Sequence, residues 1–246
     1  MIRIYADTHT HTVASTHAFS TIMENIRVAK EKGIRAIAST DHAPAIPDGA
    51  HLWHFNNIWS VPDYVDGVLV LKGVETNILD FDGNLDISQK MLEGLDWVVA
   101  SCHSPVIPPK DEQAQTHLWL EIAKNPDVDV IGHSGNPKFL YDYERCIKAF
   151  KEYGKIVEIN AHSFQPGTRP GSPKNCAEIA KLCAKYQVPV IVNSDAHFCY
   201  EIGAVERATA MLEEIDFPRE LILNADYDRF FETVQKKVKR DLSPAK

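Results

Sequence analysis

The sequence predicts an α/β domain in which parallel strands alternate with helices and close into a barrel. Seven short apolar runs, rich in β-branched residues, alternate with amphipathic stretches along the chain. The length of 246 residues is ordinary for one α/β barrel and is enough to bury a core without disulfides. Most of the eleven histidines lie just after the apolar runs, at what would be one end of such a barrel.

The elements follow from this alternation in order. The expected strands are residues 2–7, 34–40, 68–76, 96–102, 129–133, 155–160 and 189–194. The expected helices are residues 21–32, 112–124, 142–153, 173–186, 204–214 and 226–240. Ser20 or Thr21 can cap the first helix with Glu24 as capping-box partner, and Gly33 can end it. Because no repeat, low-complexity tract or linker divides the chain, residues 1–246 are expected to form one domain.

Residues 43–66 depart from the alternation. Three prolines and one glycine interrupt this segment, which has little periodicity. Its tryptophan and phenylalanine residues are Trp53, Phe55 and Trp59. A long loop in a compact domain is often a functional lid. The same segment could instead form a small hydrophobic cluster that caps the barrel, and the sequence leaves both interpretations open.

Charge and cysteine content restrict the class of protein. The net charge of −8 argues against a nucleic-acid surface, although an anionic substrate stays possible where divalent cations reverse the local sign. The five cysteines form no C-x-x-C pair and are expected to be free thiols in a reducing compartment. The N-terminus lacks a signal-peptide run, and no apolar stretch reaches membrane-spanning length. We therefore expect a cytoplasmic protein without a membrane partner.

The ends of the expected strands bear imidazoles and carboxylates. His9 and His11 follow the first strand, where residues two apart point the same way, so both can grip one ion. In α/β barrels the carboxyl ends of the strands carry the chemistry, so groups at these ends converge. The candidate ligands are His9, His11, His17, His42, Glu75, His103, His133, Asp195 and His197. Nitrogen and oxygen donors without thiolate suit Zn²⁺, Mn²⁺ or Fe²⁺, so the sequence predicts the polynuclear metal site of a metallohydrolase.

Other polar residues near these positions each have more than one interpretation. Asp7 and Asp41 could orient a ligand imidazole or could be capping or turn residues. Arg169 and Lys138, on loops after later strands, could contact phosphate or could be solvated surface charges. His162 could be a donor behind the ligands, a substrate contact or a proton donor. The histidines outside the pattern are His51, His54 and His117, of which the last is expected in a helix with a surface or packing role.

At these positions the chain resembles the polymerase-and-histidinol-phosphatase (PHP) family. The stretches that match its four motifs are Asp7–His11, Ser39–His42, His133 and Ser194–His197. The stretches that resemble its bacterial YcdX-type phosphatase branch are His9–Ala18, Trp53–Phe55 and Gly135–Lys138. The resemblance covers nearly the whole chain. It implies a distorted seven-stranded (β/α)7 TIM-like barrel that holds three divalent metal ions, often zinc, with manganese or iron in some members.

The resemblance also implies which residues hold each ion. By position, the ligand sets are His9, His11, Glu75 and Asp195 for the first ion, Glu75, His103 and His133 for the second, and His17, His42 and His197 for the third. Glu75, which bridges two ions, and Asp195 are therefore expected at the centre of catalysis. A water shared by the two bridged ions would become a hydroxide that attacks phosphorus, while the third ion binds phosphate oxygens. Two carboxylates cannot neutralise three dications, so the site favours an anionic phosphate monoester of a small molecule.

Three other functions compete with this phosphatase. A PHP-type phosphodiesterase or exonuclease is disfavoured by the absence of a basic stripe beyond Lys236–Arg240. An amidohydrolase-like deaminase often has a modified lysine where this chain has His103. A non-catalytic metal-binding scaffold would have lost ligands, and all nine positions have the expected residue type. A homo-oligomer is expected only from the resemblance, and the sequence does not identify the natural substrate.

Overall fold

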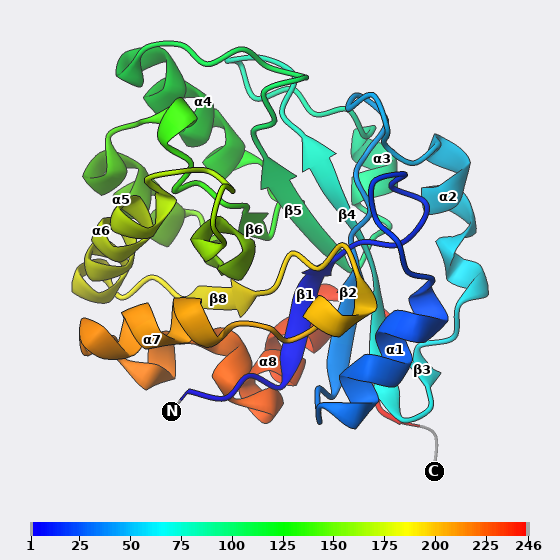
Figure 1. Cartoon of the computed structure of the whole chain (residues 1–246). Coiled ribbons are helices and arrows are strands. Elements are labelled where there is room, and N and C mark those ends of the chain that lie inside the picture. Colours follow the sequence, from blue (N-terminus) through cyan, green and yellow to red (C-terminus); the bar gives the residue numbers. More distant parts are fainter. Residues whose placement is uncertain (1, 245–246) are drawn as a thin grey trace.

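Seven parallel strands form a nearly closed barrel with helices on its outside (Figure 1). The computed structural model describes residues 2–244. In order around the barrel, the strands are β1 (Ala6–Thr10), β2 (Ala36–Ser39), β4 (Val68–Asn77), β5 (Trp97–Ser101), β6 (Val130–Ile131), β7 (Ile156–Asn160) and β8 (Val190–Asn193). Neighbours in this order pair in parallel. The predicted fold class, a distorted seven-stranded TIM-like barrel, is confirmed.

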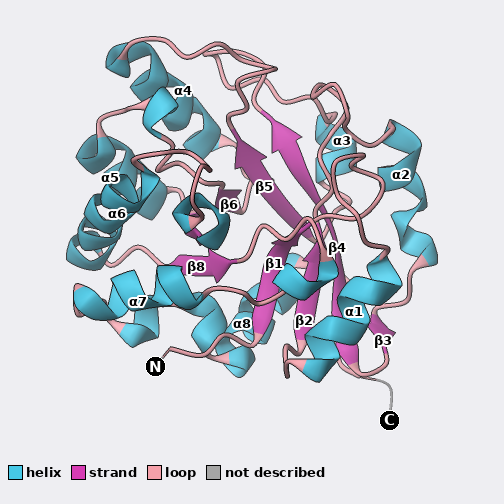
Figure 2. Cartoon of the chain, viewed as in Figure 1, coloured by secondary structure: helices cyan, strands magenta, loops and turns pink. Residues whose placement is uncertain are grey.

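The six predicted helical segments are confirmed. They are α1 (Ile22–Glu31), α4 (Glu112–Lys124), α5 (Tyr143–Glu152), α6 (Ser172–Tyr186), α7 (Glu206–Glu214) and α8 (Tyr227–Lys237). Figure 2 shows α4, α5 and α6 along one flank of the barrel and α1 along the opposite flank. Thr21 and Glu24 form the expected capping box at the start of α1. Gly33 follows that helix with φ of 73°, a left-handed conformation that glycine adopts without strain.

The ends of the first strand differ from expectation. The predicted strand covered residues 2–7, whereas β1 covers Ala6–Thr10. The backbone N–H of Ile2 donates to Glu213, and that of Tyr5 donates to the carbonyl of Asn224. The strand then continues through His9 and Thr10, which were expected to follow it. The prediction from apolar residues therefore placed the strand too early in the chain. The part of β1 at the polar end of the barrel consists of polar residues, which give no apolar signal.

Segment 43–66 contains structure that its sequence did not predict. It forms α2 (Leu52–Asn57), a 3₁₀ turn η1 (Ile58–Ser60) and β3 (Tyr64–Val65), which pairs antiparallel with β4. A short helix α3 (Gln89–Leu92) follows later. Phe55 is buried in the core, while Trp53 is 76 % exposed. The burial of Phe55 supports the capping-cluster interpretation, and a role as a lid stays a prediction.

Apolar side chains fill the barrel at the amino-terminal ends of its strands. Ala36 and Ala38 of β2 pack in the same cluster as Trp97 of β5. The indole ring of Trp97 lies 6.0 Å from the ring of Phe230, which α8 contributes. Burial of such side chains removes about 150 to 250 Å² of surface from water for each aromatic ring. Helix α8 thereby closes one end of the barrel, and polar residues are left to occupy the carboxyl end.

The five cysteines belong to the hydrophobic core. All five cysteines are buried and free. Burial raises the pKa of the Cys102, Cys146 and Cys176 thiols to about 12, so these thiols stay protonated and unreactive at neutral pH. Within residues 2–244, no helix combines the length and the apolar character that crossing a membrane requires.

A segment from the C-terminal part of the chain closes the seam between β1 and β8. At the carboxyl end, the two strands share a bridge between Thr10 and Ala196. At the other end, the fully buried Asn224 lies between them in the turn η6 (Leu223–Ala225). Its side-chain amide donates to the carbonyls of Ala6 and Val192 at 2.7 and 2.6 Å, and its Oδ1 accepts from the N–H of Val192. Two asparagines thus bridge the seam in place of backbone ladder hydrogen bonds: Asn224, and Asn193 of β8, whose Oδ1 accepts from the backbone N–H and the hydroxyl of Thr8.

Replacing Asn224 by alanine is expected to lower the free energy of unfolding by about 2 to 4 kcal/mol, because backbone groups of Ala6 and Val192 lose their buried partner. Urea unfolding of the variant measures this loss. Asn56→Ala, at an exposed position of α2, is the control and should stay within about 0.5 kcal/mol of the starting protein. Equal stability of the two variants would contradict the role of Asn224 in the seam.

Candidate metal centre

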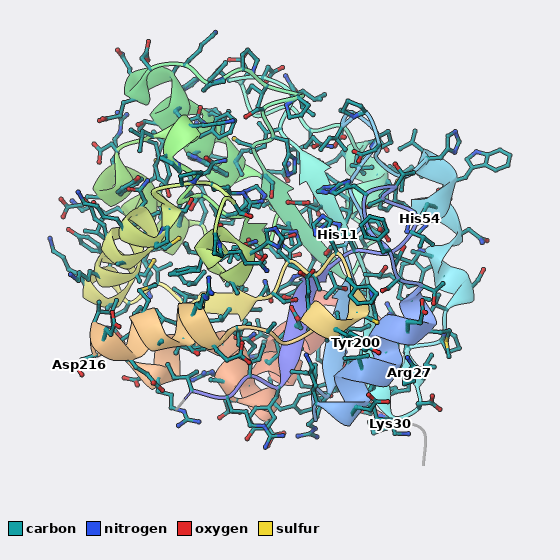
Figure 3. All side chains as sticks on the ribbon, viewed as in Figure 1. His11, Arg27, Lys30, His54, Tyr200 and Asp216 are labelled. Carbon is teal, nitrogen blue, oxygen red and sulfur yellow. The ribbon has the colours of Figure 1, made fainter. Side chains whose placement is uncertain are left out.

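Glu75 of β4 lies at the centre of the imidazoles that the strand ends supply. The nitrogen–oxygen distances are 2.6 Å to His42, 3.0 Å to His133, 3.3 Å to His9, 3.4 Å to His103 and 3.7 Å to His11. The carboxylate of Asp195 lies opposite, with Oδ1 3.1 Å from Nε2 of His11 and 3.5 Å from Nε2 of His9. Figure 3 shows His11 above the carboxyl ends of the strands. The expected convergence of these groups is therefore present.

His17 and His197 form the part of this cluster nearest to solvent. Their Nε2 atoms lie 2.8 Å apart, and their side chains are 42 % and 18 % exposed. Nδ1 of His17 contacts a carboxylate oxygen of Asp48 at 2.5 Å, and Nδ1 of His197 contacts the backbone carbonyl of Asp195 at 2.9 Å. Both partners can only accept, so each Nδ1 carries the hydrogen and each Nε2 presents a lone pair. Two lone pairs that face each other at 2.8 Å are compatible when a cation lies beside them.

The tautomers of two further imidazole rings are fixed in the same way. Nδ1 of His9 contacts Glu158 at 2.7 Å, and Nδ1 of His103 contacts Oδ1 of Asn77 at 2.7 Å. The amide of Asn77 cannot be turned round, because its Nδ2 donates to the carbonyl of Ala43 and to Asp86. Outer partners of this kind hold metal-binding histidines in one tautomer and one orientation. The Nε2 atoms of His9 and His103 are thereby directed at the centre.

Several atoms of the cluster are buried without a hydrogen-bond partner in the described part of the chain. They are His9 Nε2, His11 Nδ1, His42 Nδ1 and Glu75 Oε2. Nδ1 of His42 lies 2.6 Å from Oε2 of Glu75 without the geometry of a hydrogen bond. Buried polar atoms normally have partners, and a group of unpaired donors and acceptors is typical of a metal-binding site. The donor set of imidazoles and carboxylates fits divalent transition metals.

Three groups of side chains bring their donor atoms within 4.8 Å of one another. They are His9, His11 and Asp195; His11, His42 and His197; and His42, Glu75 and His103. His17 and His133 adjoin these groups through His197 and Glu75. The nine predicted ligands therefore all lie in one cluster.

Residues 7–162, more than half of the chain, match the PHP domain. This chain belongs to the PHP-domain family. It is 45 % identical to a probable phosphatase of Caldanaerobacter subterraneus subsp. tengcongensis over 97 % of this chain and 94 % of the relative. It is 44 % identical to a probable phosphatase of Shewanella sp. strain MR-4 over 89 % and 86 % of the two chains. The family predicted from the motifs is confirmed, and membership of the YcdX-type branch stays a prediction.

Solved structures share the fold of this PHP domain. The histidinol phosphate phosphatase of Lactococcus lactis, in complex with zinc, L-histidinol and phosphate, superposes with a TM-score of 0.59 over 87 % of this chain and 94 % of that chain. A chain of an archaeal ribonuclease P with mature tRNA gives a TM-score of 0.60 over 96 % and 94 %. Both are 14 % identical to this chain, so the likeness concerns the fold alone.

The buried charges of the PHP domain favour neutral rings and ionised carboxylates. Burial and the neighbouring His42 and His197 lower the pKa of His11 to about 3. Although burial disfavours their charge, nearby imidazoles hold the pKa values of Glu75 and Asp195 well below their usual range. His42 and His9 are the exceptions: burial opposes their protonation, but the carboxylates around them raise both pKa values, and that of His9 lies well above the usual value. A cation at this position would take the place of that proton, because metal ligands bind in their deprotonated form.

Two of the candidate ligands have a left-handed backbone. His133 has φ of 25° and Asp195 has φ of 58°. Arg169, near Asp195, has φ of 44°. Non-glycine residues adopt this region rarely, and such strain concentrates at functional sites. The barrel therefore holds these side chains in place at a cost to its backbone.

Glu158 of β7 is a residue of the site that the sequence analysis did not identify. Its carboxylate, 2 % exposed, accepts from Nδ1 of His9, from the backbone N–H of His133, and from the amides of Asn160 and Asn193. It thereby links two candidate ligands from opposite sides of the barrel. A signal was present, because an acidic residue stands inside a run of apolar residues that was predicted as a buried strand.

The two aspartates that were predicted to support the ligands have different surroundings. Within residues 2–244, the hydrogen bonds of Asp7 go to Ser194 and Gly203 rather than to an imidazole, which agrees with the turn role among its two interpretations. Asp7 thus holds the backbone next to Asp195. Asp41 is fully buried and lies 3.3 Å from Nε2 of His54, a histidine that was given no ligand role.

The predicted substrate contacts also differ from one another. Arg169 lies at the centre, where its guanidinium is 3.4 Å from Asp195 and donates to Ser163. His162 lies on the turn η3 (Ala161–Phe164), with its ring 5.7 Å from that of His197. Lys138 lies on the turn η2 (Pro137–Phe139) and is exposed. The remaining outlying histidines have structural or surface positions: His51 caps α2, and His117 is exposed on α4 beside Glu121.

Proposed function

We propose that this PHP domain is a metal-dependent phosphatase that hydrolyses phosphate monoesters of small molecules at a centre of three divalent ions. Zinc is the proposed ion, and manganese or iron would suit the same donors. The observation that supports the proposal best is the convergence of the Nε2 atoms of His9, His17, His103 and His197 on a centre with ionised Glu75 and Asp195. The names of the relatives, probable phosphatases, agree with it.

Each residue of the metal centre has a proposed role. The proposed ligand sets are His9, His11, Glu75 and Asp195; Glu75, His103 and His133; and His17, His42 and His197. When bound, the ions would activate a water as nucleophile and neutralise the charge of the phosphate. The proposed role of Arg169 is to contact a phosphate oxygen, because its guanidinium is directed to the centre by Ser163. His162, whose Nδ1 is buried without a hydrogen-bond partner in residues 2–244, is proposed as a second substrate contact, and Lys138 is too exposed to share this role without movement of its loop.

Elemental analysis of the purified protein, combined with hydrolysis of p-nitrophenyl phosphate before and after chelation, tests this function. We expect about three equivalents of metal and a turnover that chelation abolishes, because both the nucleophile and the phosphate site depend on the ions. Turnover should return when zinc is added back. Full metal content without hydrolysis of any monoester would contradict the proposal.

The same assay separates the alternatives. A phosphodiesterase or exonuclease would hydrolyse bis-p-nitrophenyl phosphate or DNA in preference to the monoester. A metal-binding scaffold would hold its ions and hydrolyse neither. The acidic net charge of −8 and the complete ligand set favour the monoesterase over both. The cytoplasmic location and the homo-oligomer stay predictions.

A further inference from the structure

We infer that His54, on helix α2 outside the barrel, is a positioning residue for the metal ion proposed between His17, His42 and His197. The inference rests on the proposed function, since that function places an ion there. Figure 3 shows His54 on the flank of the molecule, while His11 lies above the strands. His54 therefore acts through another residue and is no ligand itself. That residue is Asp41.

Asp41 organises two parts of the chain that supply ligands. Its carboxylate accepts from the backbone N–H and the hydroxyl of Thr12, both at 2.8 Å, and from the hydroxyl of Ser15 at 2.8 Å. These contacts fix the start of the loop that leads to His17. Oγ of Ser15 in turn accepts from the backbone N–H of His42 at 3.0 Å. Two of the three ligands proposed for this ion thus depend on one buried carboxylate.

His54 is the partner of Asp41 that can bear a positive charge. Its Nε2 lies 3.3 Å from Oδ2 of Asp41 as an ion-pair contact, is shielded from solvent, and has no hydrogen-bond partner elsewhere in residues 2–244. The other groups that approach Asp41 are the neutral donors of Thr12, Ser15 and Ser39. A fully buried carboxylate is costly when it lacks a charged partner. Without His54, we expect Asp41 to draw water or shift, and the loop of His17 to lose its fixed geometry.

The packing of α2 gives His54 its position. The neighbouring Phe55 is buried in the core, and the two rings lie 5.1 Å apart in an edge-on arrangement. His54 also lines a cavity of about 930 Å³ between α1 and α2, together with Thr12 and Ser39. Because this space is open beside the imidazole, a smaller side chain at position 54 would admit water to Asp41. Segment 43–66 is thereby linked to the centre from outside the barrel.

Zinc titration of the metal-free protein and its variants tests the inference. His54→Leu removes the donor at similar size, whereas His54→Gln keeps an N–H near the place of Nε2. We expect His54→Leu to bind one of three zinc equivalents about 10- to 100-fold more weakly, and His54→Gln, which keeps a donor but bears no charge, to be weakened less than His54→Leu. His51→Ala, at the N-cap of the same helix and without contact to Asp41, is the control for general damage to α2 and should bind like the starting protein.

Three outcomes would overturn the inference. The first is a His54→Leu protein that binds all three equivalents of zinc with the affinity of the starting protein. The second is an equal loss in His51→Ala, which would indicate only that α2 must be intact. The third is a starting protein that never binds three equivalents of zinc. That result would contradict the proposed function itself, whereas the first two outcomes contradict only the role of His54. If His54→Leu does not fold, His54→Asn, too short to reach Asp41, is measured against His54→Gln.

Discussion

Replacing Asp195 by asparagine is expected to abolish hydrolysis. The carboxylate contacts His11 and His9 through Oδ1 and receives the amide of Asn160 and the guanidinium of Arg169 at Oδ2. Asparagine keeps the size of the side chain and tolerates the left-handed φ of 58°, so the backbone has no reason to change. It removes the negative charge that holds a dication. The loss should exceed the roughly 10- to 100-fold that removal of an outer hydrogen-bond partner costs.

Turnover of p-nitrophenyl phosphate and the zinc content of the variant measure this effect. Asp216→Asn is a matched control, because Asp216 is an exposed aspartate that also has a positive φ, of 50°. Figure 3 shows it at the edge of the molecule, far from His11. The control should keep full activity and metal. Wild-type turnover in Asp195→Asn would refute the role given to this carboxylate.

Replacing Glu158 by glutamine should reduce metal affinity and turnover by about 10- to 100-fold. Both carboxylate oxygens accept hydrogen bonds: Oε1 from His9 and Asn193, and Oε2 from the N–H of His133 and from Asn160. A glutamine offers one oxygen, so its NH₂ group must face donors on one side. The ring of His9 or the backbone of His133 then loses its anchor. Charge also matters, because Glu158 is one of the carboxylates that favour the proton on His9.

The comparison for this change is Glu152→Gln, the same substitution on the exposed face of α5. Zinc titration and steady-state kinetics of the two variants separate a specific effect from a general loss of charge. A Glu158→Gln protein that binds zinc and turns over like the Glu152→Gln protein would show that His9 needs no carboxylate behind it.

Much of the fold could be predicted because the strands are buried and apolar over most of their length. The runs 68–76 and 96–102 became β4 and β5 almost unchanged. The elements α2, α3 and β3 were not predicted and are short, and α2 and β3 depend on contacts made elsewhere in the chain. Helix α2 is held by the burial of Phe55, and β3 exists through its pairing with β4. Local sequence preference has little influence on elements of this length.

The candidate ligands could be predicted for a different reason. His103 and His133 directly follow apolar strands, and parallel strands bring their carboxyl ends together. The residues that form hydrogen bonds to the ligands occupy no regular position relative to the strands. Asp48 reaches His17 across 31 positions of the chain, and Glu158 reaches His9 across 149. Only the folded barrel shows which of the chain's many acidic residues and amides meet an imidazole.

The seam between β1 and β8 bears on when, during synthesis, the metal centre can form. Asn224 joins Ala6 across 218 positions of the chain, and the carboxyl end of the same seam separates His9 and His11 from Asp195. A ribosome that adds about 5 to 20 residues per second makes the first strand roughly 10 to 45 seconds before Asn224. Until then the histidines of the nascent chain lack their late partners, and the edge of β1 that faces β8 is unpaired. The centre can form only late in synthesis, after Asp195 has been added, and the seam beside it closes only when Asn224 follows.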